Sequence, residues 1–250
     1  MAYCDAHMHF NLKSDDPVED LKAYIKKFQI QRGILILNTR RELELFQEYF
    51  EGVEEYREII RVVVGINKNE DYIQEGYELC KRLGQFYMVK LHPRLYGITE
   101  ETEDWYMSVL EEKRPDVIVI DDFFYGDWNK PDYVMQFVTR VAKKFKESKI
   151  VVAHSGGVDL LRHVMFTKVH KNVFYDVSLT CNYLKETTAV FNIPWELKYL
   201  PKRVMAGSDY PDYTIESSYK ICKDLLEGGN IDKEVQEQFF CKTLYDVYGK

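Results

Sequence analysis

The feature that most constrains the fold is an alternation of short apolar runs with longer amphipathic runs along the whole chain. Such alternation predicts parallel strands joined by right-handed helical crossovers. Eight strand-like runs in 250 residues are typical of a (β/α)8 TIM barrel. We therefore expect an α/β fold in which residues 1–250 form a single barrel domain. The expected strands are 2–9, 33–38, 60–67, 86–93, 116–122, 149–157, 172–178 and 203–211.

Helices are expected between these strands. The first begins near Pro17, because proline is favoured at the first helical position. The alternative fold is an open doubly wound sheet, but no glycine-rich phosphate turn follows the first strand, and "HSGG" at 154–157 is in the wrong place for a dinucleotide site. We therefore prefer the barrel. The other expected helices include 41–57, 70–84, 99–113 and 131–147.

The net charge and the apolar content of the sequence limit which partners and which cellular compartment we expect. The net charge of −7 and the lack of a basic stripe argue against a nucleic-acid partner. No apolar run approaches the roughly 20 residues that cross a bilayer, and no signal peptide opens the sequence. We expect a small-molecule substrate and no membrane partner, and we keep a homo-oligomer as an open alternative to a monomer. The five cysteines (Cys4, Cys80, Cys181, Cys222 and Cys241) form no CxxC pair, which predicts no disulfide framework and a reducing cytoplasm.

The first expected strand contains "DAHMH", with two of the six histidines of the chain. Residues i and i+2 of a strand point to one face, so Asp5, His7 and His9 are expected to project together. Two imidazoles on one face could bind a metal ion. The alternative is a pair of hydrogen-bonded, half-buried histidines.

Polar side chains recur where the expected strands end, and the active site of a barrel lies at the carboxyl ends of its strands. Four of the six histidines fall at such ends. The other two, His163 and His170, fall in or beyond the helix after the sixth strand, away from the site. The residues at the strand ends are His7 and His9, Lys90 and His92, Asp121 and Asp122, His154, and Ser208 with Asp209.

Four segments in order resemble the amidohydrolase superfamily and, within it, the amidohydrolase-2 group of metal-dependent hydrolases and decarboxylases. They are "DAHMH", "VKLHP", "IVVAHSGG" and "AGSDYP", and they span nearly the whole chain. "AHSGG" followed by "GSDYP" is more specific than the His-x-His pair. The resemblance implies metal ligands at His7, His9 and His154, with His154 alternatively facing the substrate. It also implies that Asp209 contacts the metal and handles a proton.

The chemistry of these residues agrees with that resemblance. Imidazoles with a carboxylate suit zinc, manganese or iron better than magnesium or calcium. Zinc lowers the pKa of its bound water to about 7, and Asp209 could accept the proton as a general base. The structural alternatives are a helix N-cap for Asp209 and a hydrogen-bonded strand end for His154. The group commonly has a histidine at the end of strand five, where this chain has Asp121 or Asp122.

Lys90 has two interpretations. "KLHP" also resembles the "KLYP" segment of dihydroorotases, in which a carboxylated lysine bridges two metals. The alternative is a structural ion pair with Asp5 or Asp121, because a lysine inside a barrel is costly unless it is paired. His92 shares the face of Lys90 and is a candidate substrate-binding residue together with Asp121. Arg94 could hold a substrate carboxylate through a bidentate contact.

Three functions follow from these residues. The leading one is a hydrolase with one divalent ion, zinc ahead of manganese or iron, in which metal-activated water attacks an amide, ester or lactone carbonyl of a small molecule. The second is a metal-dependent decarboxylase, in which the metal would hold the substrate carboxylate. The third is a barrel without catalysis that acts as a binding protein, an interpretation supported by the missing strand-five histidine.

Overall fold

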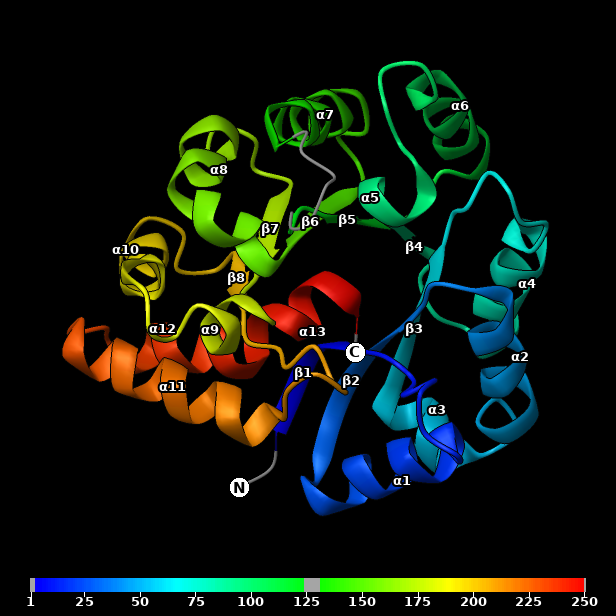
Figure 1. Cartoon of the computed structure of the whole chain (residues 1–250), viewed down its shortest axis with the longest axis horizontal. Helices are drawn as coiled ribbons and strands as arrows, with labels where there is room; N and C mark the ends of the chain where they lie inside the picture. Colours follow the sequence, from blue (N-terminus) through cyan, green and yellow to red (C-terminus); the bar gives the residue numbers. More distant parts are fainter. Residues whose placement is uncertain (1–2, 124–130, 250) are drawn as a thin grey trace.

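The computed structural model describes residues 3–123 and 131–249, and it confirms the barrel. Eight strands pair in parallel in the order of the sequence, and helices surround them (Figure 1). Residue 2 of the first expected strand lies outside the described residues. The strands are β1 (Tyr3–Met8), β2 (Ile30–Leu37), β3 (Ile60–Gly65), β4 (Met88–Leu91), β5 (Val117–Asp121), β6 (Lys149–Ala153), β7 (Val173–Asp176) and β8 (Val204–Met205).

The last strand returns to the first and nearly closes the barrel. β8 has two residues, far fewer than the expected 203–211, and the chain beyond it follows β1 as an irregular segment. Ala6 N donates to Ala206 O at 3.1 Å and His9 N donates to Tyr210 O at 2.8 Å. These bonds bring the carboxyl end of β8 beside the two histidines of β1.

The helices follow local sequence signals. Asp16 accepts a hydrogen bond from Glu19 N and caps α1, which begins at Pro17 as expected. The single helix expected over 41–57 is instead two, interrupted around Gly52, because glycine weakens a helix. The helices are α1 (Pro17–Lys27), α2 (Arg40–Tyr49), α3 (Glu54–Ile59), α4 (Ile73–Leu83), α5 (Pro93–Tyr96), α6 (Glu103–Lys113), α7 (Pro131–Lys144), α8 (Leu160–Thr167), α9 (Thr180–Tyr183), α10 (Asn192–Tyr199), α11 (Ile215–Gly228), α12 (Lys233–Glu237) and α13 (Thr243–Tyr248), with short helices η1 (His154–Asp159), η2 (Thr188–Phe191) and η3 (Gln238–Lys242).

The interior of the barrel is apolar, and α13 covers one end of it (Figure 1). Leu244 and Val247 of α13 join the cluster of inward-facing strand residues. Lys149, the first residue of β6, donates to Val247 O at 3.1 Å. Because Lys149 lies at the amino end of its strand, α13 closes the bottom of the barrel. The opposite end, where the strands finish, is therefore the end available to a ligand.

A disulfide joins Cys4 of β1 to Cys241 of η3, with 5.3 Å between their Cα atoms. The expectation of no disulfide was therefore wrong. Barrel closure brings together two residues separated by 237 positions, which spacing in the sequence does not reveal. Cys80, Cys181 and Cys222 are buried free thiols. Within residues 3–123 and 131–249, no helix has the length and apolar character that crossing a membrane requires.

Candidate active site

An extra residue in β1 decides which side chains reach the barrel mouth. Asp5 pairs with Gly33 of β2 and Met8 pairs with Leu35, so three steps on β1 match two on β2. This bulge breaks the alternation of side chains. Asp5 consequently faces α1, where Tyr24 Oη donates to it at 2.9 Å. The prediction that Asp5 shares a face with His7 and His9 was wrong, although both histidines do face the barrel mouth.

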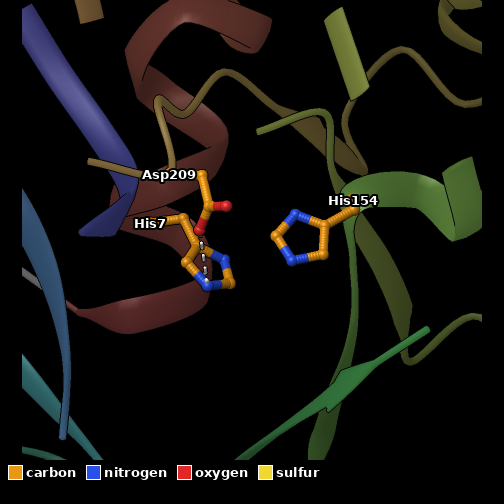
Figure 2. A group of neighbouring side chains, drawn as sticks. All are labelled: His7, His154 and Asp209. Carbon is orange, nitrogen blue, oxygen red and sulfur yellow. Dashed lines mark ion pairs between the residues drawn. The ribbon is translucent and has the colours of Figure 1, made fainter. Parts of the chain in front are cut away.

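Three predicted ligands from distant parts of the chain converge at this mouth (Figure 2). One ligand atom each of His7, His154 and Asp209 lies within 4.8 Å of the others. Asp209 Oδ1 is 3.6 Å from His7 Nε2 and 3.5 Å from His9 Nε2. His9 thus borders the group through Asp209. Asp209 does not cap a helix, since Thr214 caps α11.

Each of the three imidazoles directs its Nδ1 atom away from this centre. His7 Nδ1 lies 3.3 Å from Asp176 Oδ2, and His9 Nδ1 lies 3.3 Å from the carbonyl oxygen of Ile36. His154 Nδ1 lies 3.1 Å from the carbonyl oxygen of Ser178. Carboxylate and carbonyl oxygens accept but cannot donate, so the Nδ1 atoms of His7 and His154 each carry a proton. The Nε2 atoms of these two rings point toward the centre, an arrangement typical of metal-binding histidines.

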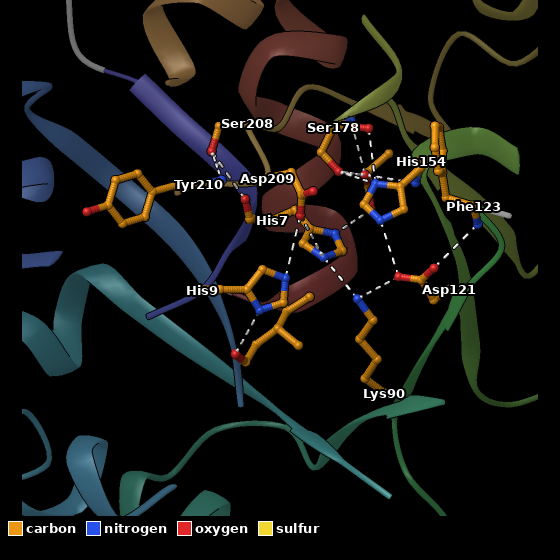
Figure 3. Close-up of polar contacts among 12 residues, drawn as sticks. His7, His9, Lys90, Asp121, Phe123, His154, Ser178, Ser208, Asp209 and Tyr210 are labelled. Carbon is orange, nitrogen blue, oxygen red and sulfur yellow. Dashed lines mark hydrogen bonds and ion pairs between the residues drawn. The ribbon is translucent and has the colours of Figure 1, made fainter. Parts of the chain in front are cut away.

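Lys90 extends into the same centre (Figure 3). Its Nζ atom is 3.0 Å from His7 Nε2 and 3.0 Å from Asp121 Oδ2. Of the two ion-pair partners considered for Lys90, the structure shows Asp121 and not Asp5. A metal ion bound at His7 Nε2 would compete with the ammonium for the same lone pair. Lys90 would then have to move toward Asp121.

Asp121 is the last residue of β5, where the resemblance implied a histidine. Its Oδ2 atom is 3.2 Å from His154 Nε2 and 3.7 Å from His92 Nε2. Asp122 points elsewhere and pairs with His163 Nε2 at 2.5 Å. Asp121 is therefore the residue of this acidic pair that belongs to the site.

The carboxylates of the site are held in their ionised form. Burial by itself would raise the pKa of Asp209, but the charge of His154 and a hydrogen bond with His9 outweigh it and lower the pKa below its usual range. Burial by itself would lower the pKa of His154, but Asp121 and Asp209 raise it to about 9. His154 must therefore lose a proton before it can bind a metal ion through Nε2.

A pocket of about 450 Å³ opens above this cluster. That size suits a small molecule. The predicted substrate-binding residues His92, Arg94 and Asp121 all line it. Several other lining residues were not predicted from the sequence, because most of them come from irregular loops and Tyr183 from the short helix α9. These are Asn38, Phe123, Leu179, Tyr183, Pro211, Asp212 and Tyr213.

The backbone at two ligand positions is left-handed. His154 has φ of 59° and Asp209 has φ of 64°, a region that few residues other than glycine adopt, although asparagine, aspartate and histidine do so more often than the rest. The turn after His154 needs glycine, because a Cβ atom on Gly156 would lie 2.2 Å from the ring of His163. His163 is thus buried beneath the loop that carries His154. The expectation that His163 lies away from the site was wrong.

Asp176 and Ser178 were not predicted. Asp176 is the last residue of β7, so the rule that polar residues gather at strand ends could have identified it within "NVFYDVS". Asn38, at the end of "GILILN", is a similar case, with Nδ2 3.4 Å from His9 Nδ1. Both residues contact a predicted ligand.

Glu196 of α10 is a further buried acid, and it supplies a prediction about stability. Neither of its carboxylate oxygens makes a hydrogen bond of normal geometry among the described residues. Burial raises its pKa well above the usual range. The folded state therefore holds a proton that the unfolded chain releases as pH rises above about 4.3. This group lowers the free energy of unfolding as pH increases.

We expect Glu196→Gln, which cannot ionise, to raise the thermal midpoint at pH 8 and to change it little at pH 5. Thermal unfolding followed by circular dichroism at both pH values measures this effect. Glu147→Gln, at an exposed position, is the control and should show no such difference. A midpoint that falls equally at both pH values would contradict the assignment of an uncompensated buried carboxyl group.

Comparisons with known proteins agree with this geometry. Residues 32–250 match the sequence model of a family described as "Amidohydrolase". No curated protein matches the sequence significantly.

Similar solved structures include an uncharacterized TIM-barrel protein, Bb4693, from Bordetella bronchiseptica, with 12% identity, a TM-score of 0.71, and coverage of 99% of this chain and 98% of the other. A dihydroorotase from Campylobacter jejuni has 14% identity and a TM-score of 0.65 over 99% of this chain and 84% of the other. An N-isopropylammelide isopropylaminohydrolase from Burkholderia multivorans has 10% identity and a TM-score of 0.58, with coverage of 93% of this chain and 64% of the other. At these identities the likeness shows the fold.

Proposed function

The chain belongs to the amidohydrolase family, and from that premise we propose that it is a metal-dependent hydrolase of a small molecule. The reaction would be attack of water on an amide, ester or lactone carbonyl. The names of two similar structures, a dihydroorotase and an aminohydrolase, support a hydrolytic reaction. The active site would be the pocket at the carboxyl ends of the strands.

One observation carries this proposal: the donor set at the barrel mouth suits a divalent transition metal. His7, His154 and Asp209 place ligand atoms within 4.8 Å of one another, and His9 Nε2 lies 3.5 Å from Asp209 Oδ1. Imidazole nitrogen ligands combined with a carboxylate ligand favour zinc, manganese or iron. When bound, such an ion supplies Lewis-acid activation of water and of a carbonyl oxygen.

The residues of the chain would divide the remaining work. Asp209 stays ionised and lines the pocket, so its carboxylate can accept a proton from the attacking water and later give it to the leaving group. Lys90 places a positive charge at the floor of the pocket, where it can stabilise negative charge that develops on the carbonyl oxygen. His92 and Asp121 would orient the substrate. Arg94 would hold a substrate carboxylate.

Metal content tests the proposal directly. We expect elemental analysis of protein prepared without chelator to find about one transition metal ion per chain. His7→Asn and His154→Asn should each lose most of it, because each removes an imidazole ligand. His170→Asn is the matched control, since His170 precedes β7 (Val173–Asp176) at the opposite end of the barrel.

A chain that stays metal-free after reconstitution with zinc or manganese would overturn the proposal. Two ions per chain would instead assign Lys90 as a carboxylated bridge. A panel of small amides, esters and lactones, assayed with and without chelator, then tests hydrolysis. Release of carbon dioxide from small carboxylic acids in place of hydrolysis would favour a decarboxylase, and metal-independent binding without turnover would favour a binding protein.

The location and the partners of the protein stay predictions. Three free thiols agree with a cytoplasmic protein, whereas the Cys4–Cys241 disulfide is unusual in a reducing compartment. A homo-oligomer and the lack of nucleic-acid and membrane partners are likewise expected on composition.

A further inference from the structure

The last residue of β7, Asp176, contacts two of the four predicted ligands, His7 and His154. Its Oδ2 atom is 3.3 Å from His7 Nδ1. Its Oδ1 atom accepts a hydrogen bond from the backbone N–H of His154 at 3.2 Å. Asp176 is fully buried, so these contacts are made without competition from solvent. One carboxylate thus links β1 to the loop after β6.

Ser178 extends this contact to the ring of His154. The Ser178 backbone N–H donates to Asp176 Oδ1 at 3.1 Å, and the Ser178 hydroxyl donates to the same atom. The Ser178 hydroxyl oxygen lies 3.0 Å from His154 Nδ1, and the Ser178 carbonyl oxygen lies 3.1 Å from it. Asp176 therefore holds the backbone of His154 directly. It holds the ring of His154 through Ser178, which lies beside that ring in Figure 3.

The partners of His7 determine where its proton lies. A lysine ammonium donates hydrogen bonds but cannot accept them, and Lys90 Nζ is 3.0 Å from His7 Nε2. His7 Nε2 is therefore the acceptor nitrogen. The proton must be on Nδ1, where Asp176 accepts it. The same proton position leaves Nε2 with the lone pair that metal binding requires.

We propose that Asp176 is the positioning residue that sets the tautomer of His7 and holds His154 at the barrel mouth, so that both Nε2 atoms face one point. This inference rests on the proposed function where it concerns metal affinity. The part that concerns the His7 tautomer holds without a metal. Asp176 itself would touch neither metal nor substrate, because its two oxygens are occupied by His7, His154 and Ser178.

Asp176→Asn tests this role because asparagine has one acceptor oxygen where aspartate has two. In the wild-type protein, Oδ1 of Asp176 accepts three hydrogen bonds and Oδ2 of Asp176 accepts one. The amide oxygen is expected to take the Oδ1 position, which turns the NH2 group toward His7 Nδ1. An NH2 group needs an acceptor, so the Nδ1–H form of His7 is no longer favoured.

The experiment combines histidine ring nitrogen NMR with metal titration. In metal-free wild-type protein we expect His7 as the Nδ1–H tautomer, assigned by its loss in His7→Asn. In Asp176→Asn we expect this signal to move, and metal affinity, measured by competition with a chelating dye, to fall about 10- to 100-fold. Asp116→Asn is the matched control, since Asp116 also accepts a backbone hydrogen bond, from Tyr87 N at 2.9 Å, but lies before β5 at the opposite end of the barrel. It should leave the His7 signal and the metal affinity unchanged.

Different failures of this experiment have different meanings. A His7 ring protonated on Nε2 in the wild-type protein would overturn the positioning role without any variant. An unchanged His7 signal and wild-type metal affinity in Asp176→Asn would overturn it as well. Wild-type protein that binds no metal, but in which the His7 signal still moves in Asp176→Asn, would contradict the proposed function and leave the positioning role supported.

Discussion

Replacement of Asp209 by asparagine is expected to lower turnover at least about 10²-fold, the contribution that a positioned acid–base group makes. The substitution preserves shape and most polar contacts, but an amide cannot accept the proton that a carboxylate accepts. The fold should survive, because Asp209 lies at the barrel mouth and not within the apolar interior. We therefore expect thermal unfolding to change little. The measurement is the initial rate on whichever ester, amide or lactone the wild-type protein hydrolyses.

Metal content must be measured on the same Asp209→Asn preparation, because Asp209 is also a predicted ligand. Loss of turnover with metal retained would favour the proton-transfer role, and loss of both would favour ligation. His170→Asn is the control and should keep its activity. His163→Asn is unsuitable for this purpose, because His163 is buried against Asp122 and Gly156. Full activity of Asp209→Asn would show that the chemistry lies on other residues.

Replacement of Lys90 by methionine is expected to destabilise the metal-free protein by about 3 kcal/mol, at the lower end of the range for a broken buried ion pair. Lys90 is 1% exposed and its Nζ atom is 3.0 Å from Asp121 Oδ2. Methionine fills a similar volume but leaves the carboxylate of Asp121 without its strongest partner. The loss of unfolding free energy is expected at the lower end of that range, because Asp121 keeps a second partner, His154 Nε2, at 3.2 Å. Urea unfolding in the presence of chelator measures it.

Two further variants make the Lys90 prediction specific. Lys22→Met is the matched control, because Lys22 forms an exposed pair with Glu19 at 2.8 Å, and such pairs contribute less than about 1 kcal/mol. Lys90→Met combined with Asp121→Asn should recover much of the lost stability, because no buried charge of that pair is then left without a partner. Equal losses from Lys90→Met and Lys22→Met would contradict a buried ion pair at the centre of the site.

The chain sequence was sufficient to predict the barrel and most of the side chains at its mouth. Apolar periodicity is a local property, since a strand between two layers needs apolar residues on both faces. The rule that ligands bind at the carboxyl ends of parallel strands then selected His7, His154 and Asp209. These residues lie in three segments separated by about 50 to 150 positions, and the barrel order alone brings them together.

Other features depend on spacing between strands, which the sequence does not encode locally. The bulge in β1 turns Asp5 toward Tyr24, and simple alternation would have placed it with the histidines. The Cys4–Cys241 disulfide exists because η3 crosses beside β1 at the bottom of the barrel. The shift of one residue in β1 decides which side chains Asp5 contacts, and the path of η3 decides which cysteine lies beside Cys4.

By itself, then, the sequence determined the parallel barrel, the family and the set of strand-end residues from which a site can be built. Only the tertiary structure decided which partner each of them has: Asp121 for Lys90, Asp122 for His163, and Asp176 for His7. The physical reason is that apolar burial and hydrogen bonding differ in how strictly they depend on distance and direction. Apolar burial is non-directional and is recorded in the periodicity of each segment, whereas a hydrogen bond requires heavy atoms at about 3 Å with defined geometry. That geometry exists only after the barrel has closed.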